Sequence, residues 1–219
     1  MAKQDKKEAS KLKIKRKIWY SLFAPKAFAS REIGESYLSE AQAAIGRKVQ
    51  ANLRDLTGNP KDQNAYVNFR ISKVNGNRLD TEAIGYELTP SFIKRAVRKN
   101  TNRMDDYFVL RTKEGKKVIV KTLMITLHKV QRSKRAALKK LLDAALKEEI
   151  VKVDFENFVI NTINYRLQSG IKKRLAKIYP LKELAIRKLV LEEHAKLMEP
   201  TAEVKEEVKE ETTEAAAEE

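Results

Sequence analysis

Residues 107–128 read YFVLRTKEGKKVIVKTLMITLH, and this stretch predicts a β-hairpin. Its two runs, YFVLRT (107–112) and KVIVKTLMITLH (117–128), are rich in the β-branched and aromatic residues that favour strands. The four residues between them, KEGK (113–116), include a glycine and three charged side chains, which is typical of an exposed turn.

Three further stretches carry strand signals. VQANL (49–53) leads into DLTGNPKD (55–62), a cluster of turn-forming residues. YVNFRISKV (66–74) alternates apolar with polar residues, which is the period of a half-buried strand, and the pair Asn75-Gly76 after it predicts a tight turn. Branched residues dominate ELAIRKLVLEE (183–193), which favours a strand there as well.

Helical periodicity occupies much of the remaining sequence. Thr89 with Pro90 after it predicts a helix start, and Ser133 predicts the N-cap of a longer helix. A third helix is expected to start at Asp154 and to end near Gly170. The predicted helices cover residues 39–46, 89–99, 133–150, 154–168 and 171–180. Strands and helices in this mixed order predict the α+β class.

The charge of the chain is large and unevenly distributed. The 219 residues carry a net charge of +16, and residues 199–219 alone hold nine Glu and two Lys, a net of −7. The preceding 198 residues therefore carry +23. Few folded proteins carry that much charge of one sign without a polyanionic partner.

Composition also divides the chain into three parts. Residues 1–18 hold eight Lys/Arg and two acidic residues, which predicts a basic RNA-binding arm that is disordered on its own. Residues 19–198 are predicted to form a single α+β body. Residues 199–219 are of low complexity and lack aromatic residues, which predicts a disordered acidic tail. That tail either keeps the protein soluble or shields the basic body from wrong RNAs.

The aromatic stretch KIWYSLFAPKAFASREIG (17–34) imitates a targeting signal without being one. A signal peptide needs an unbroken apolar core of about 7–15 residues, and here Ser21, Pro25 and Lys26 interrupt it. No run reaches the about 18 apolar residues of a membrane span. Together with the absence of cysteine, this predicts a soluble cytoplasmic protein with no membrane partner.

Catalytic chemistry is weakly represented. Without cysteine there is no thiol nucleophile or thiolate metal site, and the two histidines, His128 and His194, lie far apart. His128 is expected to face the surface or RNA. The pair Asp105-Asp106 is compatible with a metal-dependent nuclease, although a turn or cap role fits it better. We predict no catalytic residue, no metal and no cofactor.

The basic residues favour RNA as the partner. From Lys94 to Arg135 there are fourteen Lys/Arg and three acidic residues, whereas an ordinary solvated face mixes both signs. No helix-turn-helix, zinc finger or leucine zipper is present to read the DNA major groove. The predicted phosphate contacts are Lys13, Lys15, Arg16, Lys17, Lys94, Arg95, Arg98, Lys99, Arg103, Arg132, Lys134 and Arg135.

Trp19 and Tyr20 complete the predicted RNA-binding set, with two alternatives for their role. They either stack on unpaired bases or anchor the basic arm to the body, with Phe23 and Phe28 in the core. Since Pro25 and Gly34 predict a bent, compact segment, the anchoring role is favoured.

Six motifs in order resemble the small-subunit ribosomal protein family known in eukaryotes as S-three-A and in archaea as S-one-e. The first is W-Y…A-P…F…I-G, carried by Trp19-Tyr20, Ala24-Pro25, Phe28 and Ile33-Gly34. The others are carried by Leu53 and Asp55-Leu56-Thr57-Gly58, by Val97-Arg98-Lys99 with Thr101 and Met104-Asp105, by Val130-Gln131 with Ser133, by Ile178-Tyr179-Pro180-Leu181, and by Arg187-Lys188. The short form and the absence of cysteine are more similar to archaeal members.

The resemblance implies a β-rich, barrel-like body with packed helices and a structural, non-catalytic role in the small ribosomal subunit. It places the family on the platform, close to the 3′ end of the small-subunit RNA and to the messenger RNA exit region. The implied partners are this RNA, neighbouring small-subunit proteins and, through its location, messenger RNA. Three alternatives stay open: a free RNA-binding or RNA-chaperone protein that acts off the ribosome, a metal-dependent nuclease that uses Asp105 and Asp106, and a protein of the membrane surface, for which a strong apolar anchor is missing.

Overall fold

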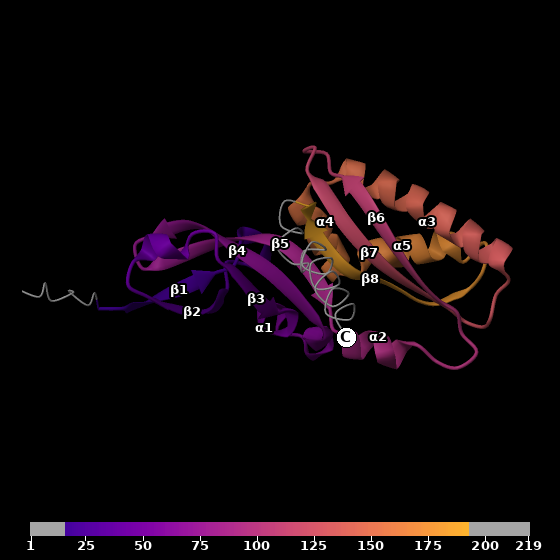
Figure 1. The fold of residues 1–219 in the computed structure, drawn as a ribbon, viewed down its shortest axis with the longest axis horizontal. Helices are drawn as coiled ribbons and strands as arrows, with labels where there is room; N and C mark the ends of the chain where they lie inside the picture. Colours follow the sequence, from indigo (N-terminus) through magenta and orange to yellow (C-terminus); the bar gives the residue numbers. More distant parts are fainter. Residues whose placement is uncertain (1–15, 193–219) are drawn as a thin grey trace, which may run out of the picture.

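In the computed structural model, which describes residues 16–192, eight strands form one sheet and five α-helices pack around it (Figure 1). The strands are β1 (Ile18–Phe23), β2 (Glu32–Leu38), β3 (Lys48–Asn52), β4 (Ala65–Asn75), β5 (Arg78–Leu88), β6 (Arg103–Arg111), β7 (Lys117–Thr126) and β8 (Leu181–Leu191). The helices are α1 (Leu53–Thr57), α2 (Pro90–Ala96), α3 (Arg132–Lys152), α4 (Phe155–Ile163) and α5 (Arg166–Leu175). The short 3-10 helices are η1 (Lys26–Phe28), η2 (Ala41–Ala44) and η3 (Pro60–Asn64).

The predicted α+β class and β-rich body are confirmed. Several predictions lie outside the described residues: Lys13 and Lys15, most of the basic arm, and the acidic tail.

Strand β5 joins the two halves of the sheet. β4 pairs with it antiparallel along most of its length, whereas its other edge pairs first with β1, in parallel, and then with β8. The strand order is β2-β1-β5-β8-β7-β6, and β3 is attached through β4. The N-terminal and C-terminal strands thus extend in opposite directions from β5, which gives the molecule its long axis (Figure 1).

Gly85 marks the point where β8 joins β5. It pairs with Val190, and a Cβ atom at Gly85 would lie only 2.7 Å from the backbone carbonyl oxygen of Leu189. Real Cβ atoms do not approach another atom so closely, so the crossing requires a residue without a side chain.

The main hydrophobic core lies between the C-terminal strands and helices α3 to α5. Leu138 and Leu142 recur along one face of α3 and are fully buried against residues such as Val120 of β7. β7 also serves a second, smaller core: Leu123 packs with Ile93 of α2. Because successive strand residues point to opposite faces, α2 and α3 cover β7 from different sides.

A separate core lies beneath the N-terminal strands. It consists of Leu22, Leu38, Ala44, Ile71 and Leu79. This cluster fixes the β1–β2 hairpin on the rest of the sheet, so the elements that follow the basic arm belong to the folded body.

The strand predictions over 49–53, 66–74, 107–128 and 183–193 are confirmed as β3, β4, the β6–β7 hairpin and β8. The Asn75-Gly76 turn is confirmed as well, since Gly76 takes the left-handed φ of 61° between β4 and β5.

Strand β5 and the β1–β2 hairpin were not predicted from the sequence. β5 reads RLDTEAIGYEL, and four consecutive residues from Ala83 to Tyr86 are buried because both faces of the strand are covered there. Such burial removes the alternation on which a strand prediction depends. In the 17–34 stretch, Pro25 ends β1 and the chain returns as β2 through η1.

Two predictions near the ends of helices are wrong in detail. The stretch 55–62, predicted as a turn, is partly helical because Asn52 caps α1, its side chain accepting a hydrogen bond from the backbone N of Arg54 at 2.9 Å. Ser133 is not the cap of α3, which begins one residue earlier with Gln131 at the N-cap position.

The predicted helices at 39–46 and 154–168 also differ from the structure. The first is only the 3-10 turn η2. The second ends at Ile163, because Tyr165 takes a left-handed φ of 56° and starts α5 in a new direction. Gly170, predicted to end it, lies inside α5.

Candidate nucleic-acid interface

Three connecting segments meet at the end of the sheet where β6 begins and β7 ends (Figure 1). They are residues 97–102, 127–131 and 176–180. The backbone N of Asn102 donates to Thr126 Oγ1 at 2.9 Å, and Asn102 Oδ1 accepts from Val130 N at 3.3 Å. Leu127 N donates to the carbonyl oxygen of Pro180 at 3.4 Å. We call this surface, together with α2 and the first turn of α3, the basic end.

Helix α2 is fixed at both of its ends. Thr89, the predicted N-cap, accepts a bond from Phe92 N through its side chain at 3.4 Å. At the other end Lys182 Nζ donates to the carbonyl oxygen of Ala96 at 3.0 Å, and Lys172 Nζ donates to the carbonyl oxygen of Lys182 at 2.7 Å. The cations on and after α2 are therefore presented by a fixed scaffold.

Four of the predicted phosphate contacts are exposed at the basic end and form no ion pair within residues 16–192. They are Lys94, Arg98, Lys99 and Arg132. His128 and Lys129 are exposed beside them, so the predicted surface position of His128 is confirmed. Positive groups that form no ion pair create the potential that a phosphate backbone neutralises.

Two other predicted contacts already have partners in the protein. A terminal nitrogen of Arg95 donates to Asn64 Oδ1 at 2.6 Å, and Arg103 forms a 2.6 Å ion pair with Asp105. Both arginines are exposed, so each partner holds the side chain in one orientation at the surface.

Two more of the predicted phosphate contacts, Lys134 and Arg135, lie in the first turn of α3. Lys134 Nζ lies 5.9 Å from the centre of the Tyr179 ring, a cation–π contact that joins α3 to the 176–180 segment. Arg135 is half-buried, and its Nε has no hydrogen-bond partner within the described part of the chain. Arg135 therefore packs against the body more than it projects into solvent.

The N-terminal members of the predicted set lie elsewhere. Arg16, Lys17 and Trp19 are exposed at the start of β1, at the end of the long axis opposite the basic end (Figure 1). Tyr20 is half-buried and packs on the N-terminal core. The structure thus separates the predicted residues into two groups instead of joining them in one surface.

Of the two residues given the favoured anchoring role, Tyr20 packs on the N-terminal core, whereas Trp19 lies at the surface. Phe23 and Phe28, predicted in the core, are both half-buried. Trp19 is 56% exposed because it points to the solvent face of the β1–β2 hairpin. Phe28 packs edge-on against the buried Phe69 ring at 5.5 Å. Phe23 is half-buried beneath the guanidinium of Arg78, 4.0 Å from its ring centre, and so lies at the rim of the core.

The structure disfavours a nuclease site at Asp105 and Asp106, and it also corrects their predicted turn position. Both lie inside β6, where consecutive side chains point to opposite faces and cannot hold one metal. Asp106 is buried and contacts Lys139 Nζ at 2.8 Å; this hydrogen bond raises the pKa of the Lys139 ammonium above its ordinary value. Within residues 16–192 no group of three or more His, Asp or Glu could hold a metal ion.

Comparisons with known proteins identify the family. The model of the Ribosomal S3Ae family matches residues 4–195 of the chain. The chain belongs to the ribosomal S3Ae family. Proteins named "Small ribosomal subunit protein eS1" from Saccharolobus islandicus strains L.S.2.15, M.14.25 and Y.G.57.14 are each 32% identical to it over 176 residues. These alignments cover 80% of this chain and 85% of each relative, and the predicted resemblance is confirmed.

In this ribosomal S3Ae family chain, the prediction missed the basic residues of α5 and its C-terminal connection. Lys173 and Lys177 are exposed and form no ion pair within the described residues. They lead into the 176–180 segment and so extend the basic end. The signal was present in IKKRLAKIYP (171–180), whose lysines lie apart from the run between Lys94 and Arg135.

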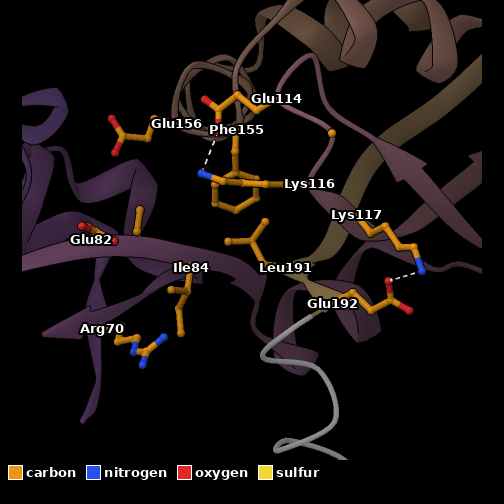
Figure 2. A pocket seen from close by; sticks show the side chains of 12 residues that line it. Arg70, Glu82, Ile84, Glu114, Lys116, Lys117, Phe155, Glu156, Leu191 and Glu192 are labelled. Atoms are coloured by element: carbon orange, nitrogen blue, oxygen red, sulfur yellow. Dashed lines mark ion pairs between the residues drawn. The ribbon is translucent and has the colours of Figure 1, made fainter. Parts of the chain in front are cut away.

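A cleft of about 580 Å³ within the described residues suits RNA phosphates poorly (Figure 2). It lies between β5, the β6–β7 turn and the start of α4, over an apolar floor that includes Phe155. Two of its cations are already paired, Lys116 with Glu114 at 2.7 Å and Lys117 with Glu192 at 3.3 Å. With four carboxylates against three cations in its lining, the cleft differs in charge from the basic end.

The helices of the described residues are short or polar in relation to the thickness of a bilayer. Within residues 16–192, none combines the length and the apolar composition needed to cross a bilayer.

Proposed function

We propose that this chain is a structural protein of the small ribosomal subunit and that its basic end binds ribosomal RNA. The family match and relatives named as small-subunit proteins support this role, which is structural and not enzymatic. The observation that carries the RNA contact is the group of exposed, unpaired cations at the basic end.

The mechanism is phosphate neutralisation by a fixed surface. Lys94, Arg98, Lys99 and Arg132 belong to α2, its C-terminal connection and the start of α3. RNA phosphates that approach this surface displace condensed counterions, and the entropy of their release favours binding. Because α2 is held at both ends, little backbone order has to be gained on binding. Arg95, Arg103, Lys134 and Arg135 complete this surface, and Lys13, Lys15, Arg16 and Lys17 contribute from the arm.

The resemblance supports a finer location. We place the protein on the platform of the small subunit in the cytoplasm, near the 3′ end of the ribosomal RNA and beside the messenger RNA exit region. Neighbouring small-subunit proteins are then further partners, and messenger RNA passes within reach.

Two measurements test the proposal. In a sucrose gradient of a native lysate, the protein should sediment with small subunits and with whole ribosomes. Ultraviolet crosslinking on intact small subunits should join residues of the basic end to RNA nucleotides near the 3′ end. Crosslinks confined to another region of the subunit would overturn the platform location and leave the ribosomal role intact.

The alternative is a free RNA-binding or RNA-chaperone protein. The basic end is equally compatible with the ribosomal role and with this alternative, because phosphate contacts do not depend on the nucleotide sequence of the RNA. A protein found only in the light fractions of the gradient, at physiological salt, would support this alternative and contradict the ribosomal role.

A further inference from the structure

Trp19 and Tyr37 form an exposed aromatic pair at the end of the molecule opposite the basic end. They stand directly opposite each other in the β1–β2 ladder, with ring centres 4.8 Å apart and ring planes inclined by 35°. Trp19 is 56% exposed and Tyr37 is 50% exposed. Two large rings in contact with each other and with water make an apolar surface that a folded protein usually buries or uses.

The groups around the pair are polar. Lys17 Nζ lies 5.6 Å from the centre of the Tyr37 ring. On the other side the next ladder pair is Ser21 with Glu35, which share the solvent face because side chains alternate along a strand. Along the solvent face of the hairpin, the Lys17 ammonium is followed by the two aromatic rings and then by the Ser21 hydroxyl and the Glu35 carboxylate.

This pattern fits a nucleobase better than a protein partner. The centre of a protein–protein interface is depleted of charged residues, whereas here Lys17 lies against the Tyr37 ring and Glu35 lies two residues before Tyr37 on β2. A base needs only a ring-sized apolar platform, and its own phosphate needs a cation close by. Lys17 and the exposed Arg16 supply that cation at the end of a segment with eight basic and two acidic residues.

We propose that Trp19 and Tyr37 bind an unpaired base of single-stranded RNA by stacking, with Lys17 at the adjoining phosphate. This site rests on the proposed RNA-binding function and adds a second contact of different chemistry to it. The carboxylate of Glu35 repels phosphate, so the RNA backbone approaches from the Lys17 side. Paired RNA is excluded because its bases are already stacked within the helix.

The experiment uses Trp19 as its own reporter, since it is the only tryptophan of the chain. Single-stranded oligoadenylate is titrated into the full-length protein while tryptophan fluorescence is recorded. Binding of the same oligonucleotide, carrying an end label, is followed in parallel by anisotropy. Stacking predicts that the fluorescence is quenched and that quenching saturates together with the anisotropy. Inorganic polyphosphate, which has the charge without the bases, should bind without this quenching.

Variants then separate stacking from folding. Because one stacked base contributes about 1–3 kcal/mol, Tyr37→Ala and Trp19→Ala should each weaken oligoadenylate binding by about 5- to 150-fold. Tyr107→Ala is the matched control, since Tyr107 is 54% exposed and has Lys121 at 5.7 Å from its ring, yet lies on β6. This control should change the affinity less than about twofold. Both ring variants should keep the melting temperature of the parent, because the rings they remove are exposed.

The outcomes are distinct. Saturating anisotropy with unchanged tryptophan fluorescence would overturn the stacking site and leave RNA binding by the basic end in place. Equal quenching by polyphosphate and oligoadenylate would also overturn it, since charge alone would then explain the signal. If oligoadenylate fails to bind at all while the protein still sediments with small subunits, the stacking site is wrong and the ribosomal role stands.

Discussion

Neutralising three cations of the basic end should flatten the salt dependence of RNA binding. The variant is Lys94→Gln/Arg98→Gln/Lys99→Gln, which removes three exposed side chains without ion pairs in the described structure. Each lost phosphate contact lowers the slope of log affinity against log salt by about 0.7–0.9, so three should lower it by about 2–2.7. Between about 50 and 200 mM salt, the ratio of parent to variant affinity should then change by about 20- to 40-fold.

The assay is anisotropy of a labelled fragment of small-subunit ribosomal RNA, titrated at several salt concentrations. A control variant, Lys147→Gln/Lys152→Gln/Arg174→Gln, removes the same net charge from side chains that already pair with carboxylates, at 2.7, 3.9 and 2.9 Å. For this control, the slope of log affinity against log salt should differ from the parent value by no more than about 0.7–0.9, which is the contribution of one phosphate contact. If both triple variants lower the slope equally, overall charge explains binding and the basic end has no special role.

Three further predictions concern the fold. Gly85→Ala should lower the free energy of unfolding by about 1–3 kcal/mol in chemical denaturation, since the new Cβ would meet the Leu189 carbonyl oxygen at 2.7 Å. Gly170→Ala, in a helix with nothing within 4 Å, should instead raise it by up to about 1 kcal/mol, and equal losses at both sites would refute the close approach at Gly85. Leu142→Ala should cost about 2–5 kcal/mol because the residue is 1% exposed in the main core, and a loss below about 1 kcal/mol would mean that the core relaxes around it. Burial raises the pKa of the Tyr86 phenol above its ordinary 10.0, so the stability it contributes is complete below pH 10 and is lost as pH rises further. Tyr86→Phe should flatten the loss of stability above pH 10, and an unchanged profile would show that another group causes it.

The elements that the sequence predicted are those with a local cause. The β6–β7 hairpin carries its own turn, and α2 carries its cap at Thr89 and a proline in its first turn. β5 could not be found in this way, because Gly85 and the buried residues around it reflect contacts with β4 and β8 from distant parts of the chain. Local patterns decide which of these elements form, whereas β5 depends on partners that its own stretch does not contain.

The candidate site shows the same division. Lys94 to Arg103 and Lys129 to Arg135 meet because the intervening hairpin returns the chain to its starting end, which the predicted hairpin already implied. The exposure of Trp19 could not be predicted, since it depends on which face of the β1–β2 hairpin packs into the N-terminal core, and that face carries Leu22 and Leu38. A shift of one residue in that hairpin would have buried Trp19 and exposed its neighbour.

The distance between the two groups of predicted RNA-binding residues determines which RNAs could contact both. The basic end and the Trp19–Tyr37 pair lie at opposite ends of one sheet, joined by paired strands and not by a flexible linker (Figure 1). Two contacts on a rigid spacer reinforce each other only when the RNA presents both sites at the matching separation. Phosphate contacts alone cannot distinguish one RNA from another, and neither can a single stacked base. The fixed distance between an RNA surface at one end and an unpaired base at the other can distinguish between RNAs. The protein would therefore select a folded RNA by its shape without reading its sequence.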